Sequence, residues 1–129
     1  MLYAILCYNS EEAIAAWSTE HHDRTMQRLR TVQDGLARQG RLGPVARLLP
    51  TTAATTLRKG REDLVIDGPF AETKEQLLGF FIVDCAGLDD AIATARDLAR
   101  ANPATGSYEI RPVAQLHGGQ LPGPRPPAP

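Results

Sequence analysis

This sequence lacks long apolar runs, a strong net charge and paired cysteine motifs. No run approaches about 18 apolar residues, so no membrane-spanning helix is expected. The net charge of −1 gives no overall attraction toward nucleic acid or an anionic membrane, and we expect neither as a direct partner. The two cysteines, Cys7 and Cys85, form no C-x-x-C motif, and Met1–Tyr3 lacks the basic start of a signal peptide. We therefore expect a cytoplasmic protein with reduced, buried thiols.

Motifs for nucleotide cofactors, metals and serine nucleophiles are also missing. The chain has no P-loop, no G-x-G-x-x-G fingerprint, no H-E-x-x-H and no G-x-S-x-G. His21 and His22 are adjacent, so on a helix they point about 100° apart and cannot chelate a metal as an i,i+4 pair would. We expect no cofactor and no metal. A general-base role for one of these histidines and a surface position at a helix start both remain open.

The spacing of apolar residues predicts two long helices. The first begins at a Ser18 or Thr19 cap and ends before Gly40. Its apolar stripe recurs every three or four residues, at Met26, Leu29, Val32 and Leu36. The second helix covers residues 88–100, where many alanines allow close packing on a sheet, and Asn102-Pro103 ends it.

Apolar segments without helical spacing predict the strands. Leu2–Tyr8 and Phe80–Val83 are apolar on both alternating faces, which is typical of central strands. The remaining strands are expected at Leu42–Leu49, at Thr55–Arg58 and Leu64–Ile66 as a hairpin, and at Tyr108–Val113. This order predicts an α+β ferredoxin-like sandwich with an inserted β-hairpin and both helices on one sheet face.

The chain is long enough for one domain. With 129 residues and 43% hydrophobic content, it can fill a single core. We expect residues 1–115 to form that domain and residues 116–129, rich in Gly and Pro, to form a disordered tail.

One layer of helices would leave one face of the sheet uncovered. Because both predicted central strands are apolar on both faces, we expect a second copy to cover that face in a two-fold homodimer. Within the sheet we expect Leu2–Tyr8 and Phe80–Val83 to be parallel neighbours. Cys7 and Cys85 would then approach each other near the carboxyl ends of these strands.

Residues 67–79 combine charge and backbone constraint more densely than any other part of the chain. Asp67 is expected where a strand leaves the sheet, and Pro69, which has no N–H, must end the strand pairing. Phe70 is expected to anchor the turn in the core. Thr73–Gln76 has the spacing of a capping box and predicts one helical turn. Gly79 would allow the backbone of another strand to approach closely.

The charges around this segment predict a polar site at the edge of the sheet. A lysine beside carboxylates can separate their acid and base roles, and an arginine can hold a carboxylate through two hydrogen bonds. We take Asp67, Glu72 and Lys74 as candidate catalytic residues and Glu75, Arg111 and His22 as candidate substrate-binding residues. They would bind or transform a small anionic metabolite. The alternative, that these charges cap the turn and form ion pairs, stays open.

The same segment carries a resemblance to a known family. Residues 67–79 resemble the signature of the DGPF-domain group of the YCII-related family, with Asp67–Phe70 and Thr73–Gln76 as its most distinctive parts. The likeness extends over most of residues 1–113 and includes Gly40–Leu42, the threonine-rich stretch 51–56, Glu109 and Arg111–Val113.

This resemblance implies a ferredoxin-like fold that pairs into a dimeric α/β barrel. The family's biochemical role is mostly unassigned, although some related members resemble small-molecule lyases, isomerases or dehydrochlorinating enzymes. DGPF proteins are often associated with extracytoplasmic-function sigma factors, which implies a non-enzymatic regulatory module as the alternative. Whether the chain is an enzyme stays open. The histidine that some YCII-type members carry on the first helix has no clear match here, because Leu29 stands in its register, after His21 and His22.

Overall fold

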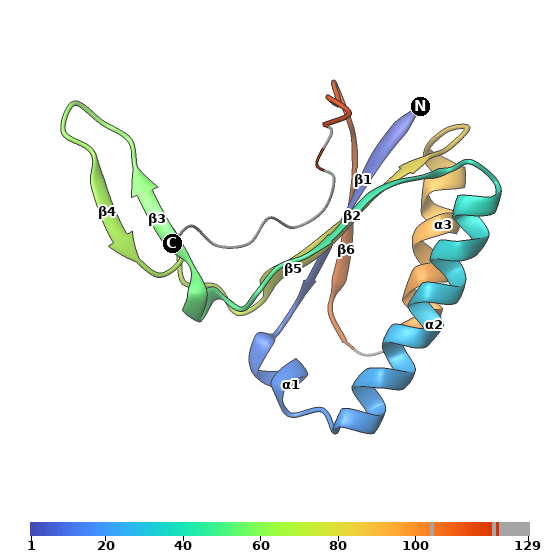
Figure 1. Ribbon diagram of the computed structural model, residues 1–129, viewed down its shortest axis with the longest axis horizontal. Helices are drawn as coiled ribbons and strands as arrows, with labels where there is room; N and C mark the ends of the chain where they lie inside the picture. Colours follow the sequence, from blue (N-terminus) through green and yellow to red (C-terminus); the bar gives the residue numbers. More distant parts are fainter. Residues whose placement is uncertain (104, 120, 122–129) are drawn as a thin grey trace.

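A four-stranded sheet with helices packed on one face forms the body of the protein (Figure 1). The computed structural model describes residues 1–103, 105–119 and 121. The elements in chain order are β1 (Leu2–Asn9), α1 (Glu11–Ala15), α2 (Thr19–Arg38), β2 (Leu42–Arg47), a 3-10 turn (Thr51–Ala53), β3 (Thr55–Arg58), β4 (Leu64–Asp67), β5 (Gln76–Asp84), α3 (Leu88–Ala101) and β6 (Ser107–Pro112). Most of the tail predicted at 116–129 lies outside the described residues.

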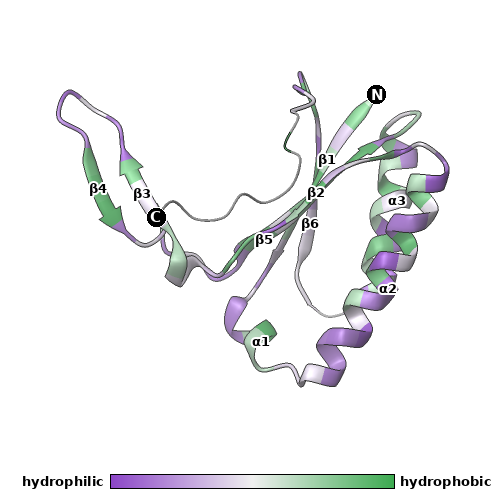
Figure 2. Ribbon diagram, viewed as in Figure 1, coloured by the Kyte–Doolittle hydropathy of each residue, from purple (hydrophilic) through white to green (hydrophobic). Residues whose placement is uncertain are grey.

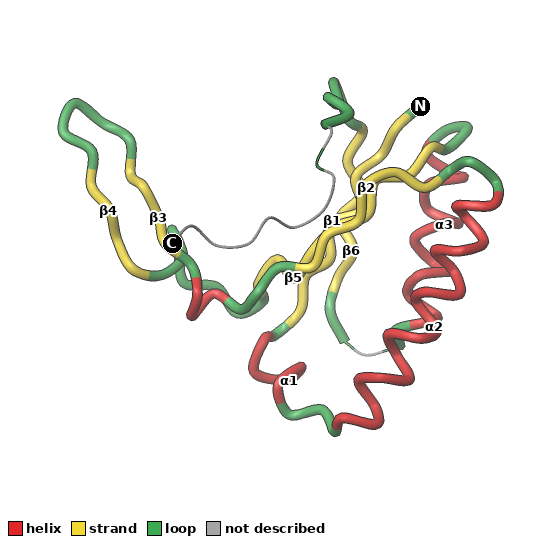
Figure 3. The backbone as a smooth tube through the Cα atoms, viewed as in Figure 1, coloured by secondary structure: helices red, strands yellow, loops and turns green. Residues whose placement is uncertain are grey.

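The sheet has the strand order β2-β5-β1-β6, and every neighbouring pair runs antiparallel. Helices α2 and α3 lie side by side on one face of it, as Figure 3 shows. This arrangement is α+β and is compatible with the predicted ferredoxin-like fold. Among the described residues, no helix has both the length and the apolar character needed to cross a membrane.

The prediction that Leu2–Tyr8 and Phe80–Val83 are parallel is wrong. The crossover through α2 makes β1 and β2 parallel, and β5 lies between them and runs against both. Cys7 therefore lies near the end of β1, whereas Cys85 follows β5 at the start of β1, where its N–H donates to the carbonyl of Met1 at 2.9 Å. The two thiols do not approach each other. Cys85 is buried and Cys7 is half-buried.

Helix α2 begins and ends where the sequence predicted. The Oγ of Ser18 accepts a hydrogen bond from the N–H of His21 at 3.0 Å, which caps the first turn. Gly40 follows the last turn with a φ of 68°, a conformation that favours glycine. Leu29 and Leu36 of the predicted stripe are buried, and burying each contributes about 1.5–3 kcal/mol. Figure 2 shows the alternation of hydrophilic and hydrophobic residues along α2 that this packing requires.

The core fills the space between the helices and one sheet face. Ile5 of β1 and Val83 of β5 are completely buried, and Leu98 of α3 packs into the same cluster. Because side chains alternate along a strand, Leu6 and Ile82 point to the opposite face, on the side away from α2 and α3. A single chain does not test whether a second copy covers that face, so the homodimer remains a prediction.

Strands β3 and β4 form a separate two-stranded sheet that projects from the body (Figure 1). Three large apolar side chains on it, Leu57, Leu64 and Val65, are 56–66% exposed. An isolated hairpin is only marginally stable in water. Exposed apolar surface of this kind is typical of a region that contacts another molecule.

The segment after β4 departs from two predictions. Asp67 ends β4 as expected, and Gly68 follows with a φ of 105°. Phe70, however, is 82% exposed, so it does not anchor the turn in the core of this chain. Thr73–Gln76 is not helical, because Gln76 already belongs to β5 and pairs with Asn9. The strand pairing thus prevails over the local capping pattern, and the Thr73 hydroxyl donates to the carbonyl of Glu75 instead.

Candidate functional site

The residues predicted as a site are spread over three regions of the structure. Asp67, at the end of β4, and Glu72, Lys74 and Glu75, on the connection from β4 to β5, are all exposed. In the part of the chain that the structure describes, none of them forms an ion pair. Their proposed site role is not tested by this arrangement and stays a prediction.

Two further candidates lie elsewhere. Arg111 is exposed on the edge strand β6, opposite Ala4 of β1 and therefore on the sheet face that points away from the helices. His22 lies in the second turn of α2 and lines a large cavity on the other face. The fold thus separates Arg111 from His22, and none of the other predicted site residues lines this cavity.

The cavity lies between α2 and the sheet and has a volume of about 600 Å³. Its walls are largely apolar, with Met26 and Leu29 from α2 and Phe81 from β5. Trp17, which follows α1, completes one wall. The volume and the apolar lining are typical of sites for small organic molecules.

A positive group and an imidazole meet at the cavity. An Nη of Arg47, the last residue of β2, lies 3.2 Å from Nε2 of His22. Arginine can only donate, so in this contact Nε2 of His22 is the acceptor. Nδ1 lies 3.7 Å from a carboxylate oxygen of Asp23. At 3.7 Å the contact with Asp23 is longer than a hydrogen bond, so the close polar contact of the imidazole is the one with Arg47.

Arg47 retains N–H donors that no carboxylate occupies. No described acidic residue forms an ion pair with Arg47 or with Arg30, the second arginine of the cavity lining. A guanidinium beside an apolar wall can bind a carboxylate through two parallel hydrogen bonds. This part of the cavity is thus suited to the charged end of an organic anion.

Gly79 forms part of the floor of the cavity. A Cβ at this position would clash with the carbonyl oxygen of Ala46 in β2. The predicted close backbone approach at Gly79 is therefore confirmed. Arg47 of β2 and Cys7 of β1 are the partners of Gly79 on either side.

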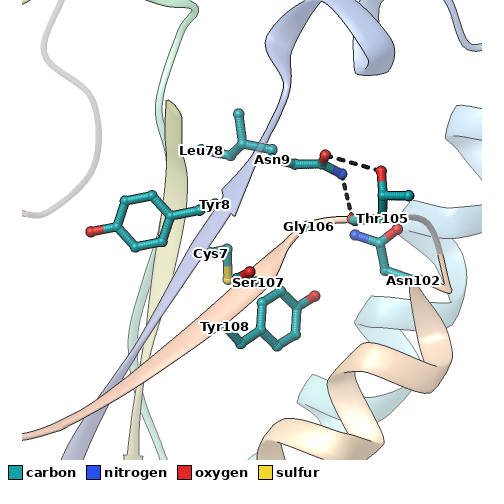
Figure 4. Close-up of a pocket in the computed structure, with 9 residues that line it drawn as sticks. All are labelled: Cys7, Tyr8, Asn9, Leu78, Asn102, Thr105, Gly106, Ser107 and Tyr108. Atoms are coloured by element: carbon teal, nitrogen blue, oxygen red, sulfur yellow. Dashed lines mark hydrogen bonds between the residues drawn. The ribbon is translucent and has the colours of Figure 1, made fainter. Parts of the chain in front are cut away.

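The inner end of the cavity is polar but uncharged. Cys7, Asn102 and Tyr108 line it and also line a smaller cavity of about 80 Å³ behind it (Figure 4). Burial raises the pKa of the Cys7 thiol to about 12. Burial also raises the pKa of the Tyr108 phenol to about 12, with the nearby Cys7 adding to the shift and a hydrogen bond from Asn102 opposing it. Both groups are neutral at physiological pH, so Cys7 is not an activated nucleophile.

The carboxylate of Glu11 connects helix α1 to the turn that follows β2. Both oxygens of Glu11 accept hydrogen bonds from Thr51, one from its N–H and one from its hydroxyl, each at 2.7 Å. The N–H of Glu11 donates to the side-chain oxygen of Gln76 at 3.0 Å. These bonds hold the segment that carries Ile14 and Trp17, both of which line the cavity.

Sequence reasoning missed most of this cavity. Arg47 and Tyr108 come from opposite edge strands, and only the strand register brings them to one face. His22 was a candidate, but nothing local in the sequence indicated Arg47 as its neighbour. Trp17, as the chain's one tryptophan beside a helix cap, was a signal that could have drawn attention to this region.

The sheet order and the helices on one face define a small α+β protein that is compatible with a ferredoxin-like fold. The chain belongs to the YCII-related family, because the model of the YCII-related domain matches residues 1–117. It is also similar to an uncharacterized protein of Rhizobium meliloti (strain 1021), with 60% identity over 123 residues, which is 95% of this chain and 99% of that protein. The family membership predicted from residues 67–79 is confirmed.

Proposed function

We propose that this protein binds a small organic anion in the cavity between α2 and the sheet. The observation that carries the proposal is the Arg47 guanidinium, which lies against His22 at 3.2 Å and pairs with no described carboxylate. Anion binding was predicted for the Asp67–Glu75 segment. The cavity supports it better, because it offers concave apolar walls that the exposed segment lacks.

A transformation of the bound anion would use His22. Its imidazole lines the cavity, and its Nε2 lies 3.2 Å from an Nη of Arg47. It would accept a proton from, or return one to, a ligand whose anionic end is held by Arg47. Binding alone requires only the guanidinium and the apolar walls.

The tryptophan provides a direct test of binding. Trp17 is the one tryptophan in the chain and lines the cavity, so its fluorescence reports on occupancy. We expect 3-phenylpropionate to change this emission and its neutral amide, 3-phenylpropionamide, to bind more weakly. Arg47→Ala should weaken binding of the carboxylate roughly tenfold or more, since a hydrogen bond to a charged group contributes about 1.5–3 kcal/mol.

Two matched controls distinguish this site from the predicted one. Lys74→Ala and Arg111→Ala each remove one positive charge outside the cavity and should leave binding unchanged. If these variants lose binding while Arg47→Ala retains it, the anion site lies at the segment that the sequence indicated. If no carboxylate changes the emission of the native protein, the proposal fails.

We propose a homodimer as the assembly around this site. The support is the sheet face on which α2 and α3 do not pack, together with the exposed apolar side chains Leu57, Leu64 and Val65 of the β3–β4 hairpin. Sedimentation equilibrium at micromolar concentration should give twice the chain mass, and a monomer there would contradict the proposal. The association with a sigma factor rests on the resemblance alone, and no described feature favours it.

A further inference from the structure

The contact between His22 and Arg47 requires a neutral imidazole. Nε2 of His22 accepts a hydrogen bond from an Nη of Arg47 at 3.2 Å, and a ring nitrogen accepts only while it carries no proton. After protonation both ring nitrogens are donors. Two donors and two positive charges would then face each other in this contact. A proton on His22 is therefore opposed by Arg47 in the arrangement that the structure shows.

An anion bound at this contact removes the opposition. A carboxylate has two oxygens, so one oxygen accepts from an N–H of Arg47 while the other accepts from the protonated Nε2 of His22. Hydrogen bonds between charged partners are shorter and roughly twice as strong as neutral ones. The same pair of side chains thus favours a proton on the imidazole when an anion lies between them.

The acidic residues around the imidazole do not take the place of such an anion. Asp23 of α2 lies 3.7 Å from Nδ1, and its side chain is 73% exposed, so solvent screens its charge. Glu11 of α1 also lines the cavity, but both of its oxygens already accept from Thr51. Neither carboxylate lies between the imidazole and the guanidinium.

The other ionisable groups of the cavity lining carry positive charge or none. Arg30 of α2 is the second guanidinium, and no described acidic residue pairs with it. Cys7 of β1 and Tyr108 of β6 are neutral at physiological pH, because burial raises the pKa of each to about 12. A proton on His22 therefore adds a further positive charge to the lining, and an anionic ligand balances it.

We infer that the cavity takes up its anion together with one proton, which His22 holds on Nε2, so that the ligand is bound between an imidazolium and the guanidinium of Arg47. This inference rests on the proposed function, because Arg47 remains the anchor. It adds a second ligand-binding group and restricts the ligand to oxyanions that present two oxygens. Because linkage is reciprocal, the proton must strengthen anion binding by the same factor as the anion strengthens proton binding.

Isothermal titration calorimetry counts this proton. 3-Phenylpropionate is titrated at about pH 7, within the range where histidine changes its charge, in two buffers that differ in ionisation enthalpy. The difference between the two observed heats gives the number of protons taken up, and we expect net uptake. Calorimetry is preferred to Trp17 fluorescence here, because the ring of His21 lies 4.4 Å from that of Trp17 and its own protonation would alter the emission.

The affinity should also depend on pH. We expect it to rise roughly tenfold or more as the pH falls from about 8 to about 5.5, as a hydrogen bond between charged groups predicts. The carboxyl group of the ligand titrates near pH 4, so it stays ionised throughout this range.

Two matched variants assign the proton to its residue. His22→Gln keeps an acceptor for Arg47 but cannot take up a proton, so it should bind without proton uptake and with little dependence on pH. The side chain of His22 is 35% exposed, which limits the risk to folding, and circular dichroism checks it. His21→Gln removes the adjacent imidazole, which does not line the cavity, and should retain both the uptake and the pH dependence.

The outcomes keep the two ideas apart. Binding without proton uptake, or uptake that persists in His22→Gln, overturns the inference and leaves anion binding at Arg47 intact. Loss of the uptake in His21→Gln also overturns it, because the proton would then belong to the neighbouring ring. Absence of carboxylate binding at every pH overturns the proposed function itself.

Discussion

Replacing Gly79 with alanine should destabilise the protein much more than one added methyl group usually does. Gly79 lies on β5 with β2 on one side and β1 on the other. A Cβ there would clash with the carbonyl oxygen of Ala46 and lie 3.2 Å from Cα of Arg47. Both neighbours are backbone atoms, so no side-chain rotation relieves the clash. Strand β2 must move away from β5.

The size of the effect follows from two costs. Overpacking a filled site typically costs about 1–3 kcal/mol. Displacing β2 also weakens one or two strand hydrogen bonds, each of which contributes about 0.5–1.5 kcal/mol. We therefore expect Gly79→Ala to lower the free energy of unfolding by about 2–4 kcal/mol, a large part of the total for a domain of this size. Urea unfolding followed by circular dichroism measures it.

Gly35 supplies a matched control with the opposite sign. It lies inside α2, and a Cβ there would meet only the end of the Arg38 side chain, at 3.9 Å. Gly35→Ala should raise the free energy of unfolding by about 0.5–1 kcal/mol, because alanine is the better helix former. If Gly79→Ala is as stable as the native protein, β2 and β5 do not pack as closely as described, and the floor of the cavity is not the one on which the ligand proposal depends.

Two further predictions concern the cavity lining. Glu11→Ala removes both hydrogen bonds from Thr51, so the α1 segment should become more mobile. We expect a red-shifted Trp17 emission and a free energy of unfolding that is lower by about 1–3 kcal/mol. An unchanged emission would show that other contacts hold the segment. The protein should also lose stability as the pH rises from about 9 toward 12, because Cys7 has a folded-state pKa of about 12 against an ordinary 9.0 and its unfolded-state thiol ionises first. Cys7→Ala should reduce that pH dependence in urea unfolding measured at pH 8 and pH 10, and an identical dependence would mean that burial of Cys7 is not its source.

Local signals were enough to locate most elements. The cap at Ser18 and the glycine at Gly40 fixed both ends of α2, because each meets a backbone requirement within one turn of the chain. Gly79 was recognised as a point of close approach for a similar reason. These effects act over a few residues, so they can be recognised from the sequence alone.

Long-range relations were harder to predict. The direction of β1 relative to β5 depends on the crossover between β1 and β2, not on any residue in either strand, and the assumed parallel pairing was wrong. The capping pattern at Thr73–Gln76 was outweighed by strand pairing. The contact between His22 and Arg47 depends on α2 bringing its second turn over the end of β2. No local pattern encodes such a contact, so the candidate site could be predicted only in part.

The strand order also divides the chain into two interleaved halves. Residues before the β3–β4 hairpin supply β1 and β2, and residues after it supply β5 and β6, yet the sheet alternates between them in the order β2-β5-β1-β6. Neither half can assemble a sheet without the other, so the two must fold in a single cooperative step. The β3–β4 hairpin connects the two halves. Extra residues inserted at its tip, near Gly60, would lengthen this connection without disturbing any strand of the four-stranded sheet.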